Sequence, residues 1–274
     1  MERIGLVIHP TRPVDRALAG VRRWAADQGL AVVELQGDAE PGDLVIALGG
    51  DGTVLHALRA AAPAGAPVLG VACGSLGALT AVTANALERA LDRVLAGDWT
   101  ARPLPALAIG SDGAPLQWAI NDFVALRRGG TQVVADVSVD GETYVRLAGD
   151  GVIVATPLGS SAYSMAAGGP VLLAGTQAFV CTPLAMHGGS AAPLVVPSGA
   201  TLAVEVHPGF GGFEVEIDGQ RRPATGVHYQ FSLHAKKVTI IGFDEPRVGL
   251  RSLRERGLIA DSPRVLARDA RKSR

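Results

Sequence analysis

Cysteine is scarce in this chain of 274 residues, and its scarcity excludes a fold held together by disulfides. Only Cys73 and Cys181 are present, and two free thiols are typical of a protein in a reducing compartment. There is no Cys-x-x-Cys pair or histidine-rich spacing, so no structural zinc is expected and no residue is predicted as a metal ligand. The sequence also has no uninterrupted run of about 18 apolar residues, which argues against a membrane span.

The chain also lacks an excess of charge of either sign. Its formal net charge is −1, which gives no reason to expect general nucleic-acid binding. Residues 264–274 are locally basic, and a solvated tail explains them more simply than a nucleic-acid arm. The first residues enter an expected strand without the basic region and apolar core of a signal peptide. We therefore expect a cytoplasmic protein that binds neither nucleic acid nor membrane.

What the sequence does have is an alternation of strand and helix patterns in its N-terminal part. Strands are predicted over short apolar runs, at residues 4–8, 31–35, 44–48 and 68–72. Helices are predicted over residues 14–28, 54–62 and 84–96, with Gly29 and Pro63 ending the first two. Strands that alternate with helices predict an α/β domain with a parallel, doubly wound sheet.

The composition changes after Pro103 and Pro105. Strand-length β-rich runs follow, at residues 117–126, 131–139, 142–147, 151–155, 201–207, 213–217, 227–233 and 237–242. Turn signals such as Asp140-Gly141 separate several of them, which predicts a mainly antiparallel β domain. Residues 156–183 are poor in β signals. We divide the chain into an α/β nucleotide-binding domain, residues 1–103, and a β-rich domain, residues 104–244, with residues 245–274 able to pack back on the first.

The turn Gly49-Gly50-Asp51-Gly52-Thr53 lies between a predicted strand and a predicted helix. Ligands bind at such junctions in open α/β sheets. Glycines let the backbone approach a phosphate, and the helix N-terminus offers free N–H donors. The turn has neither the lysine of a P-loop nor the third glycine of a dinucleotide fingerprint. Asp51 would repel phosphate unless it bound a metal or took a proton from a hydroxyl, so the turn indicates phosphoryl transfer to an alcohol.

Two further segments carry candidate binding groups. Residues 73–77, Cys-Gly-Ser-Leu-Gly, directly follow a predicted strand and could form another wall of the same crevice. Residues 149–164 run from a strand into a loop that contains Thr156, Ser160, Ser161 and Ser164, and also Tyr163. The hydroxyl groups can hydrogen-bond a base edge and a ribose, and the tyrosine ring can stack on a flat ring. The simpler alternative is a polar turn with a partly buried tyrosine.

Asn121 and Asp122 interrupt an otherwise apolar run, residues 118–126. Burying an amide and a carboxylate is costly unless both find partners. Either the pair lies at a strand end or edge that meets water, or it holds ribose hydroxyls or a base. His56 follows Gly52 by one helical turn and lies near the expected crevice, whereas His187 occurs in a separate Gly-rich segment. A lone histidine is more often structural than catalytic.

Taken together, these segments resemble the NAD kinase family. The resemblance runs from about residue 44 to residue 243, in consistent order: Gly-Gly-Asp-Gly-Thr at residues 49–53, the Asn-acidic pair at 121–122, the run at 150–170, and Asp-Gly-Gln at 218–220. The first motif is shared with diacylglycerol and sphingosine kinases. The run Thr-Pro-Leu-Gly-Ser-Ser-Ala-Tyr at residues 156–163 is far more specific to NAD kinases.

The resemblance implies an ATP-dependent transferase that moves the γ-phosphoryl group to the 2′-hydroxyl of the adenosine ribose of NAD, giving NADP. It implies an α/β domain, a β domain, a site between them, and a homodimer or homotetramer. Asp51 would be the general base, since a positioned carboxylate can accept the proton of a poor nucleophile. Mg²⁺ would bridge the ATP phosphates. ATP and polyphosphate are both compatible donors, and NAD and NADH are both compatible acceptors.

The resemblance also assigns the binding residues by position. It assigns phosphate contacts to Gly49, Gly50, Gly52 and Thr53. It assigns contacts with the adenosine half of NAD to Asn121 and Asp122, and contacts with the nicotinamide half to Asp150. The adenine and ribose pocket would be formed by Ser161, Ala162, Tyr163 and Ala166, and His56 and Gln220 would make further contacts with the dinucleotide.

This chain departs from the family pattern at several positions. Asp122 stands where glutamate is usual, Leu158 where serine or threonine is usual, and Ala148 and Ala192 where arginines are usual. These departures leave open a kinase of the same fold that acts on another nucleoside, nucleotide or polyol. A lipid kinase is less compatible with the hydroxyl-rich loop. A sensor that binds NAD without turnover would gain nothing from Asp51 beside phosphates.

Overall fold

The computed structural model describes residues 2–243, 250–255 and 257–272. The N-terminal part contains β1 (Arg3–Ile8), α1 (Asp15–Asp27), β2 (Ala31–Glu34), β3 (Asp43–Gly49), α2 (Asp51–Ala61), β4 (Pro67–Ala72), β5 (Val82–Thr83), the 3₁₀ turn η1 (Ala84–Ala86) and α3 (Leu87–Leu95). The strands pair in the order β4-β3-β1-β2, and every pair is parallel.

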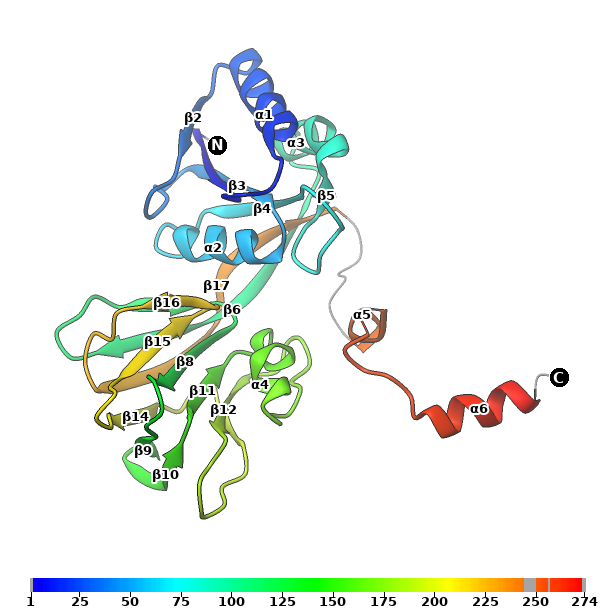
Figure 1. The fold of residues 1–274 in the computed structure, drawn as a ribbon. Coiled ribbons are helices and arrows are strands. Elements are labelled where there is room, and N and C mark those ends of the chain that lie inside the picture. Colours follow the sequence, from blue (N-terminus) through cyan, green and yellow to red (C-terminus); the bar gives the residue numbers. More distant parts are fainter. Residues whose placement is uncertain (1, 244–249, 256, 273–274) are drawn as a thin grey trace.

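Helices cover both faces of this parallel sheet (Figure 1). On one face, Val21 and Trp24 of α1 pack with Leu87 and Leu91 of α3 against the apolar side chains of β1, β3 and β4. On the other face, the apolar side of α2 forms a separate cluster that includes Leu58. The predicted doubly wound α/β arrangement is therefore confirmed. The reason is local, because each strand is a short apolar run and each helix has one apolar face.

The C-terminal part adds β6 (Thr100–Ser111), β7 (Gln117–Ala119), β8 (Asp122–Arg127), β9 (Val133–Val139), β10 (Glu142–Gly149), β11 (Gly151–Ala155), η2 (Gly159–Ser161), α4 (Tyr163–Ala166), β12 (Ala178–Leu184), β13 (Leu194–Pro197), β14 (Leu202–His207), β15 (Phe213–Ile217), β16 (Gln220–Arg222) and β17 (His228–Gly242). The helices α5 (Leu250–Glu255) and α6 (Pro263–Lys272) follow. No helix in the described part of the chain is long and apolar enough to cross a membrane.

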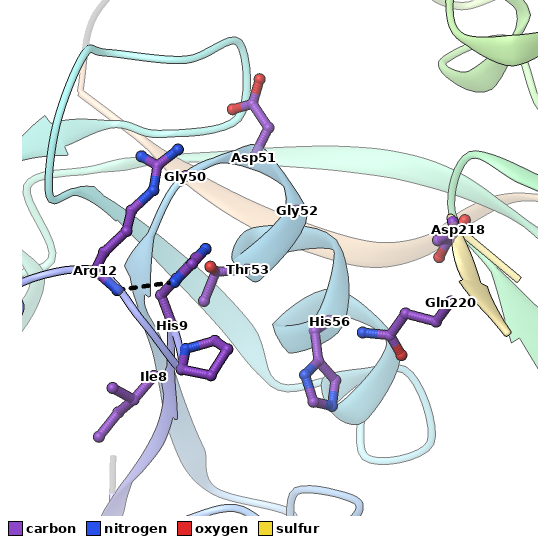
Figure 2. Close-up of a pocket in the computed structure, with 12 residues that line it drawn as sticks. Ile8, His9, Arg12, Gly50, Asp51, Gly52, Thr53, His56, Asp218 and Gln220 are labelled. Carbon is purple, nitrogen blue, oxygen red and sulfur yellow. Dashed lines mark hydrogen bonds between the residues drawn. The ribbon is translucent and has the colours of Figure 1, made fainter.

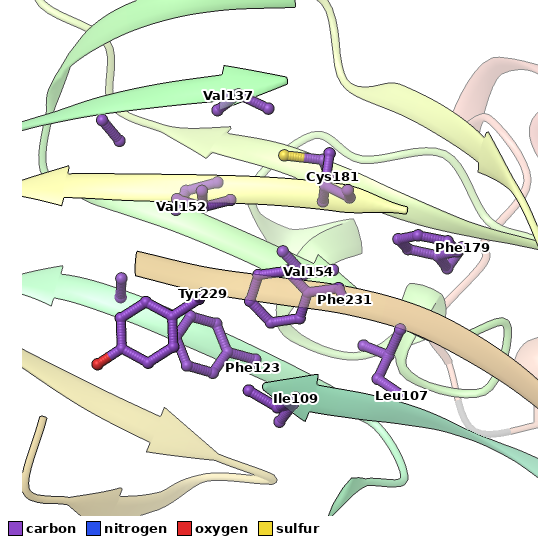
Figure 3. Packing of buried hydrophobic residues seen from close by; sticks show 14 of the residues in the cluster. Leu107, Ile109, Phe123, Val137, Val152, Val154, Phe179, Cys181, Tyr229 and Phe231 are labelled. Carbon is purple, nitrogen blue, oxygen red and sulfur yellow. The ribbon is translucent and has the colours of Figure 1, made fainter. Parts of the chain in front are cut away.

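Two sheets result. The long strand β17 pairs in parallel with β4 and antiparallel with β6 and β14, so it extends the N-terminal sheet into the β-rich part. A second, antiparallel sheet has the order β13-β12-β11-β8-β15-β16. An apolar core between them includes Phe123, whose ring centroid lies 4.9 Å from those of Tyr229 and Phe231 (Figure 3). The mainly β nature of this part is confirmed.

Several predicted elements were wrong in detail. The predicted strand 117–126 is two strands, β7 and β8, which belong to different sheets because the extended conformation is interrupted between them. The predicted strands 227–233 and 237–242 are one strand, β17, with a register shift between His234 and Val238. Helix α2 begins at Asp51 rather than at residue 54. The segment predicted to be poor in strands, 156–183, contains most of β12, and β6, β13 and β16 were not predicted.

The predicted domain boundary at residue 103 falls within strand β6. β6 passes through residue 103 and pairs along β17, so one strand serves both parts. The division at residue 103 stays a prediction. The predicted packing of residues 245–274 on the first domain also stays a prediction, since residues 244–249, 256 and 273–274 lie outside the described residues.

Candidate active site

Asp51 is the first residue of α2, directly after the carboxyl end of β3. Gly50 precedes it in an extended conformation and offers no side chain to cap the helix. The Asp51 carboxylate accepts two backbone hydrogen bonds, from Ala78 N to Oδ2 at 3.0 Å and from Leu79 N to Oδ1 at 2.9 Å. The loop after β4 therefore lies against Asp51. None of residues 73–77 lines the pocket described below, so the predicted part of this segment in the ligand crevice stays a prediction.

Gly77 makes this contact possible. A Cβ atom at this position would lie only 2.1 Å from Asp51 Oδ1, well inside van der Waals contact. The loop can therefore bring its N–H groups to the carboxylate only if this residue has no side chain. Thr80 Oγ1 accepts the Gly77 N–H at 2.7 Å and fixes the loop from the other side. The carboxylate position is thus determined by two segments that are distant in sequence.

A pocket of about 440 Å³ lies beside the start of α2. Its lining comes from the loop after β1, the first residues of α2 and the β15–β16 turn, and includes His9, Arg12, Asp51, His56, Asp218 and Gln220. In Figure 2 the carboxylate of Asp51 points away from His56 and Gln220, in agreement with its hydrogen bonds to the loop after β4. Gly50, Gly52 and Thr53 line the same pocket, while Gly49 ends β3 next to them.

Asp218 holds the break between β7 and β8. The backbone of Asp218 has a positive φ of 49°, and its side chain is completely buried. Oδ1 accepts the N–H groups of Ile120, Asn121 and Asp122 at 3.1, 2.6 and 3.1 Å. Three successive N–H groups that point at one carboxylate cannot also take part in a β ladder. This is the physical reason why the predicted strand 117–126 is broken.

Arg59 connects α2 to this turn. Its guanidinium donates to Asp218 Oδ2 at 3.2 Å, to the Ile217 carbonyl at 2.8 Å and to Gln220 Oε1 at 2.6 Å. Arg222 donates to the same oxygen of Gln220 at 3.2 Å. Because its oxygen is occupied, the Gln220 amide presents N–H donors to the pocket. Burial and the positive charges of Arg59 and Arg222 lower the pKa of His56, so this histidine is neutral at pH 7.

Asn121 and Asp122 lie where the two sheets meet: Asn121 precedes β8, and Asp122 is the first residue of that strand. Asp122 is 5% exposed. Burial, with the nearby charges of Asp218 and Glu216, raises its pKa to about 7. Asn121 Oδ1 is buried and has no hydrogen-bond partner among the described residues. An amide oxygen left in this state is costly, and a ligand donor would remove the cost.

Two family models match this chain: the ATP-NAD kinase N-terminal domain over residues 21–99 and the ATP-NAD kinase C-terminal domain over residues 121–231. The NAD kinase of Koribacter versatilis is 36% identical over 243 residues, which cover 80% of this chain and 85% of that protein. The chain belongs to the NAD kinase family. The NAD kinase of Symbiobacterium thermophilum is 42% identical over 183 residues, which cover 65% of this chain and 64% of that protein.

Solved structures of this family share the fold. Yeast NADH kinase complexed with NADH matches with a TM-score of 0.76 and 20% identity, over 96% of this chain and 89% of that one. An NAD kinase from Archaeoglobus fulgidus in complex with ATP matches with a TM-score of 0.71 and 23% identity, over 94% and 100%. At these identities the likeness establishes the fold alone, and the site of this family member is built from its own residues.

The hydroxyl groups of the loop in this NAD kinase family member already have partners within the protein. Thr156 Oγ1 donates to the Ile120 carbonyl at 2.7 Å, Ser164 Oγ lies 2.9 Å from Thr182 Oγ1, and Ser161 Oγ donates to the Leu158 carbonyl at 3.1 Å. Thr156 and Ser164 are buried, whereas Ala162, Tyr163 and Ala166 are exposed. None of these residues lines the pocket beside Asp51. Their part in dinucleotide binding stays a prediction.

Asp150 lies at the turn between β10 and β11, apart from that pocket. Arg127 Nε donates to its Oδ1 at 2.5 Å, and His187 Nε2 lies 3.9 Å from the same oxygen. Its predicted place near the nicotinamide half of NAD is not tested by these contacts and stays a prediction. His187, which the sequence favoured as structural, is thus close to a predicted site residue.

Two charged residues of the pocket region, Arg12 and Arg59, were missed by sequence reasoning, and so was the structural role of Asp218. Arg59 follows His56 by three residues on α2, so helical spacing could have placed both on one face. Arg12 follows the carboxyl end of β1, and parallel neighbouring strands end at the same edge of a sheet. Asp218 was noted in the family motif, but no local signal indicated that its carboxylate binds a segment about 100 residues away.

Proposed function

We propose that this chain is an ATP-dependent NAD kinase, which transfers the γ-phosphoryl group of ATP to the 2′-hydroxyl of the adenosine ribose of NAD to give NADP. The observation that carries the proposal is the Asp51 carboxylate, fixed by two backbone N–H groups at the edge of a pocket between a strand and a helix N-terminus. Membership of the family supports it, as do relatives described with NADH and with ATP.

Asp51 would act as the general base. As the ribose oxygen forms its bond to the γ-phosphorus, the bond from that phosphorus to the β,γ-bridging oxygen breaks and ADP leaves. The hydroxyl proton passes to the Asp51 carboxylate and then to water. The N–H groups of Ala78 and Leu79 hold both carboxylate oxygens in place, and each oxygen keeps a lone pair for the proton. Such positioned proton transfer contributes about 100- to 10,000-fold to a rate.

The other residues would bind and orient the two substrates. We assign phosphate contacts to Gly49, Gly50, Gly52 and Thr53, which surround the start of α2. The unpartnered Asn121 Oδ1 suits a hydroxyl or amino donor of adenosine, with Asp122 beside it. The exposed ring of Tyr163 suits stacking on adenine, with Ser161, Ala162 and Ala166 around it and Thr156 and Ser164 shaping the loop. Neutral His56 and Gln220 suit uncharged polar groups.

Magnesium belongs to this proposal as a companion of the nucleotide. Within the described residues, no group of three or more His, Cys, Asp or Glu could hold a metal ion. The two carboxylates of the pocket, Asp51 and Asp218, are each held by N–H donors. The residues therefore fit a Mg²⁺ ion that is bound chiefly through ATP phosphates, where it offsets their charge. ATP and Mg²⁺ are thus the proposed cosubstrate and cofactor.

A direct assay tests the proposal. Pure protein is incubated with ATP, Mg²⁺ and NAD, and NADP is detected with an NADP-dependent dehydrogenase. The alternative of another nucleoside, nucleotide or polyol acceptor is supported by Asp122, a shorter carboxyl group than the usual glutamate. ADP release over a panel of such acceptors separates the two. Turnover of another alcohol without turnover of NAD would overturn the first proposal.

The predicted cytoplasmic location and the predicted homodimer or homotetramer are also proposals. Analytical ultracentrifugation of the full chain would give the subunit number. Fractionation of the source cells would give the location.

A further inference from the structure

Arg12 lines the pocket beside the start of α2, yet the family resemblance assigned it no role. It follows β1, and Ile8 of that strand is paired with Leu48 of β3. His9 N donates to the Leu48 carbonyl at 3.0 Å. The loop that carries Arg12 therefore leaves the sheet at the same edge as the Gly50–Asp51 turn, and both segments line the pocket.

The Arg12 backbone is held in place by His9. Nδ1 of the His9 ring accepts the N–H groups of both Thr11 and Arg12, at 3.2 and 3.1 Å. Figure 2 shows the second of these bonds. One ring nitrogen that binds two successive N–H groups closes a tight turn. The backbone of Arg12 is thus fixed before any ligand binds, which lowers the entropy cost of binding.

The Arg12 guanidinium reaches both glycine-rich turns. A Cβ atom on Gly50 would lie 3.3 Å from Arg12 Nη1, and one on Gly74 would lie 3.2 Å from the same atom. Both turns therefore leave room for the guanidinium because they lack side chains at these residues. Figure 2 shows the Arg12 side chain extending toward Gly50 and the start of α2.

The charge of Arg12 has no acidic partner within the described chain. No described Asp or Glu forms an ion pair with it, in contrast to Arg3, Arg59 and Arg127. The carboxylate of Asp51, which also lines the pocket, is bound by the N–H groups of Ala78 and Leu79. A guanidinium with free donors in a pocket, beside a helix start that no side chain caps, is suited to a multiply charged oxyanion.

We propose that Arg12, together with the N–H groups at the start of α2, binds two adjacent phosphates of a substrate, as a pyrophosphate unit. The proposal rests on the phosphoryl transfer proposed above. ATP and NAD both contain such a unit, and separate kinetic measurements for each substrate distinguish the two. The fork of a guanidinium can donate to two oxygens at once, which a lysine ammonium cannot reproduce.

The test compares Arg12→Met and Arg12→Lys with Arg16→Met, a matched exposed arginine on α1. KM for ATP and KM for NAD are measured separately, with the melting temperature as a check on the fold. We expect Arg12→Met to raise one KM by about 10- to 100-fold, Arg12→Lys to restore part of the loss, and Arg16→Met to match wild type. A raised KM for ATP identifies the donor, and a raised KM for NAD identifies the acceptor.

Three outcomes would overturn the inference while leaving NAD kinase activity intact: both KM values within twofold of wild type, a loss of kcat with unchanged KM values, or an equal effect of Arg16→Met. If the wild-type protein forms no NADP, the proposed function fails separately. Calorimetric binding of inorganic pyrophosphate to wild type and Arg12→Met then still decides the inference. Weaker binding to the variant supports it, and equal binding overturns it.

Discussion

Asp51 and Asp218 are two aspartates whose carboxylates accept backbone N–H groups, and they differ in what surrounds them. Asp51 is held by two N–H groups and borders the pocket with part of its surface exposed. Asp218 accepts N–H groups from three successive residues and is completely buried against Arg59. The same kind of hydrogen bonding therefore leaves one carboxylate able to exchange a proton and makes the other a structural junction.

The buried cation accounts for the difference. Arg59 has a side chain that is 9% exposed, so its charge must be compensated inside the protein. A buried pair contributes little net stability compared with apolar residues, but breaking it by removing one partner is costly. Asp51 has no such partner, since its described hydrogen bonds come from neutral peptide groups. Substitution should thus affect chemistry at Asp51 and folding at Asp218.

The largest expected effect is on turnover in Asp51→Asn. The amide keeps an oxygen that can accept one of the two N–H groups, but it cannot take the hydroxyl proton. We expect kcat for NADP formation to fall by about 100- to 10,000-fold, with little change in the melting temperature and in NAD binding. Steady-state kinetics, calorimetry and thermal melting check this. Near-normal turnover would remove Asp51 from the role of base.

The next effect is on stability in Asp218→Ala. The substitution leaves the Arg59 charge buried and the N–H groups of residues 120–122 without their acceptor, so we expect a loss of about 3–5 kcal/mol in the free energy of unfolding. Urea unfolding measures it, and Asp38→Ala, an exposed aspartate, serves as control. Arg59→Met in the same background should recover part of the loss. A loss no larger than that of the control would show that Asp218 is not a structural junction.

Gly77→Ala should give a smaller effect, which should change both catalysis and stability. The added methyl group would collide with Asp51 Oδ1, so the loop or the carboxylate must move. We expect a loss of about 1–3 kcal/mol in stability and a fall of about 10- to 100-fold in kcat. Gly37→Ala, where a Cβ meets nothing within 4 Å, is the matched control. Unchanged kinetics would mean that this loop does not position Asp51.

The difference between the two aspartates also explains how far the sequence could be read. The turn around Asp51 was predictable, because a buried strand, a glycine cluster and a helix follow one another locally. The run at residues 156–163, which includes Tyr163, indicated the family because it is also a local sequence pattern. The role of Asp218 was not predictable, since its partners are a helix residue 159 positions away and a strand break 96 to 98 positions away. The broken strand 117–126 has this cause, and so does the unforeseen pairing of Arg59 with Asp218.

The smallest effect concerns the pH dependence of stability at Asp122. Burial, with the charges of Asp218 and Glu216, raises its pKa in the folded protein from 3.8 to about 7, and Arg59 pairs with Asp218. Between those values the folded state binds more protons than the unfolded state. The contribution of Asp122 to stability is therefore complete below pH 4 and is lost as the pH rises toward 7.

Asp122→Asn should remove this contribution. Because the amide does not titrate, we expect the variant to lose less stability than wild type between pH 4 and pH 7, by roughly 1 kcal/mol or more. Urea unfolding at several pH values measures the difference, and Asp38→Asn provides the control. An unchanged slope would mean that Asp122 is not the group whose raised pKa makes stability depend on pH in this range. Burial also raises the pKa of Asp218, so the proton would then be assigned to that neighbouring carboxyl group.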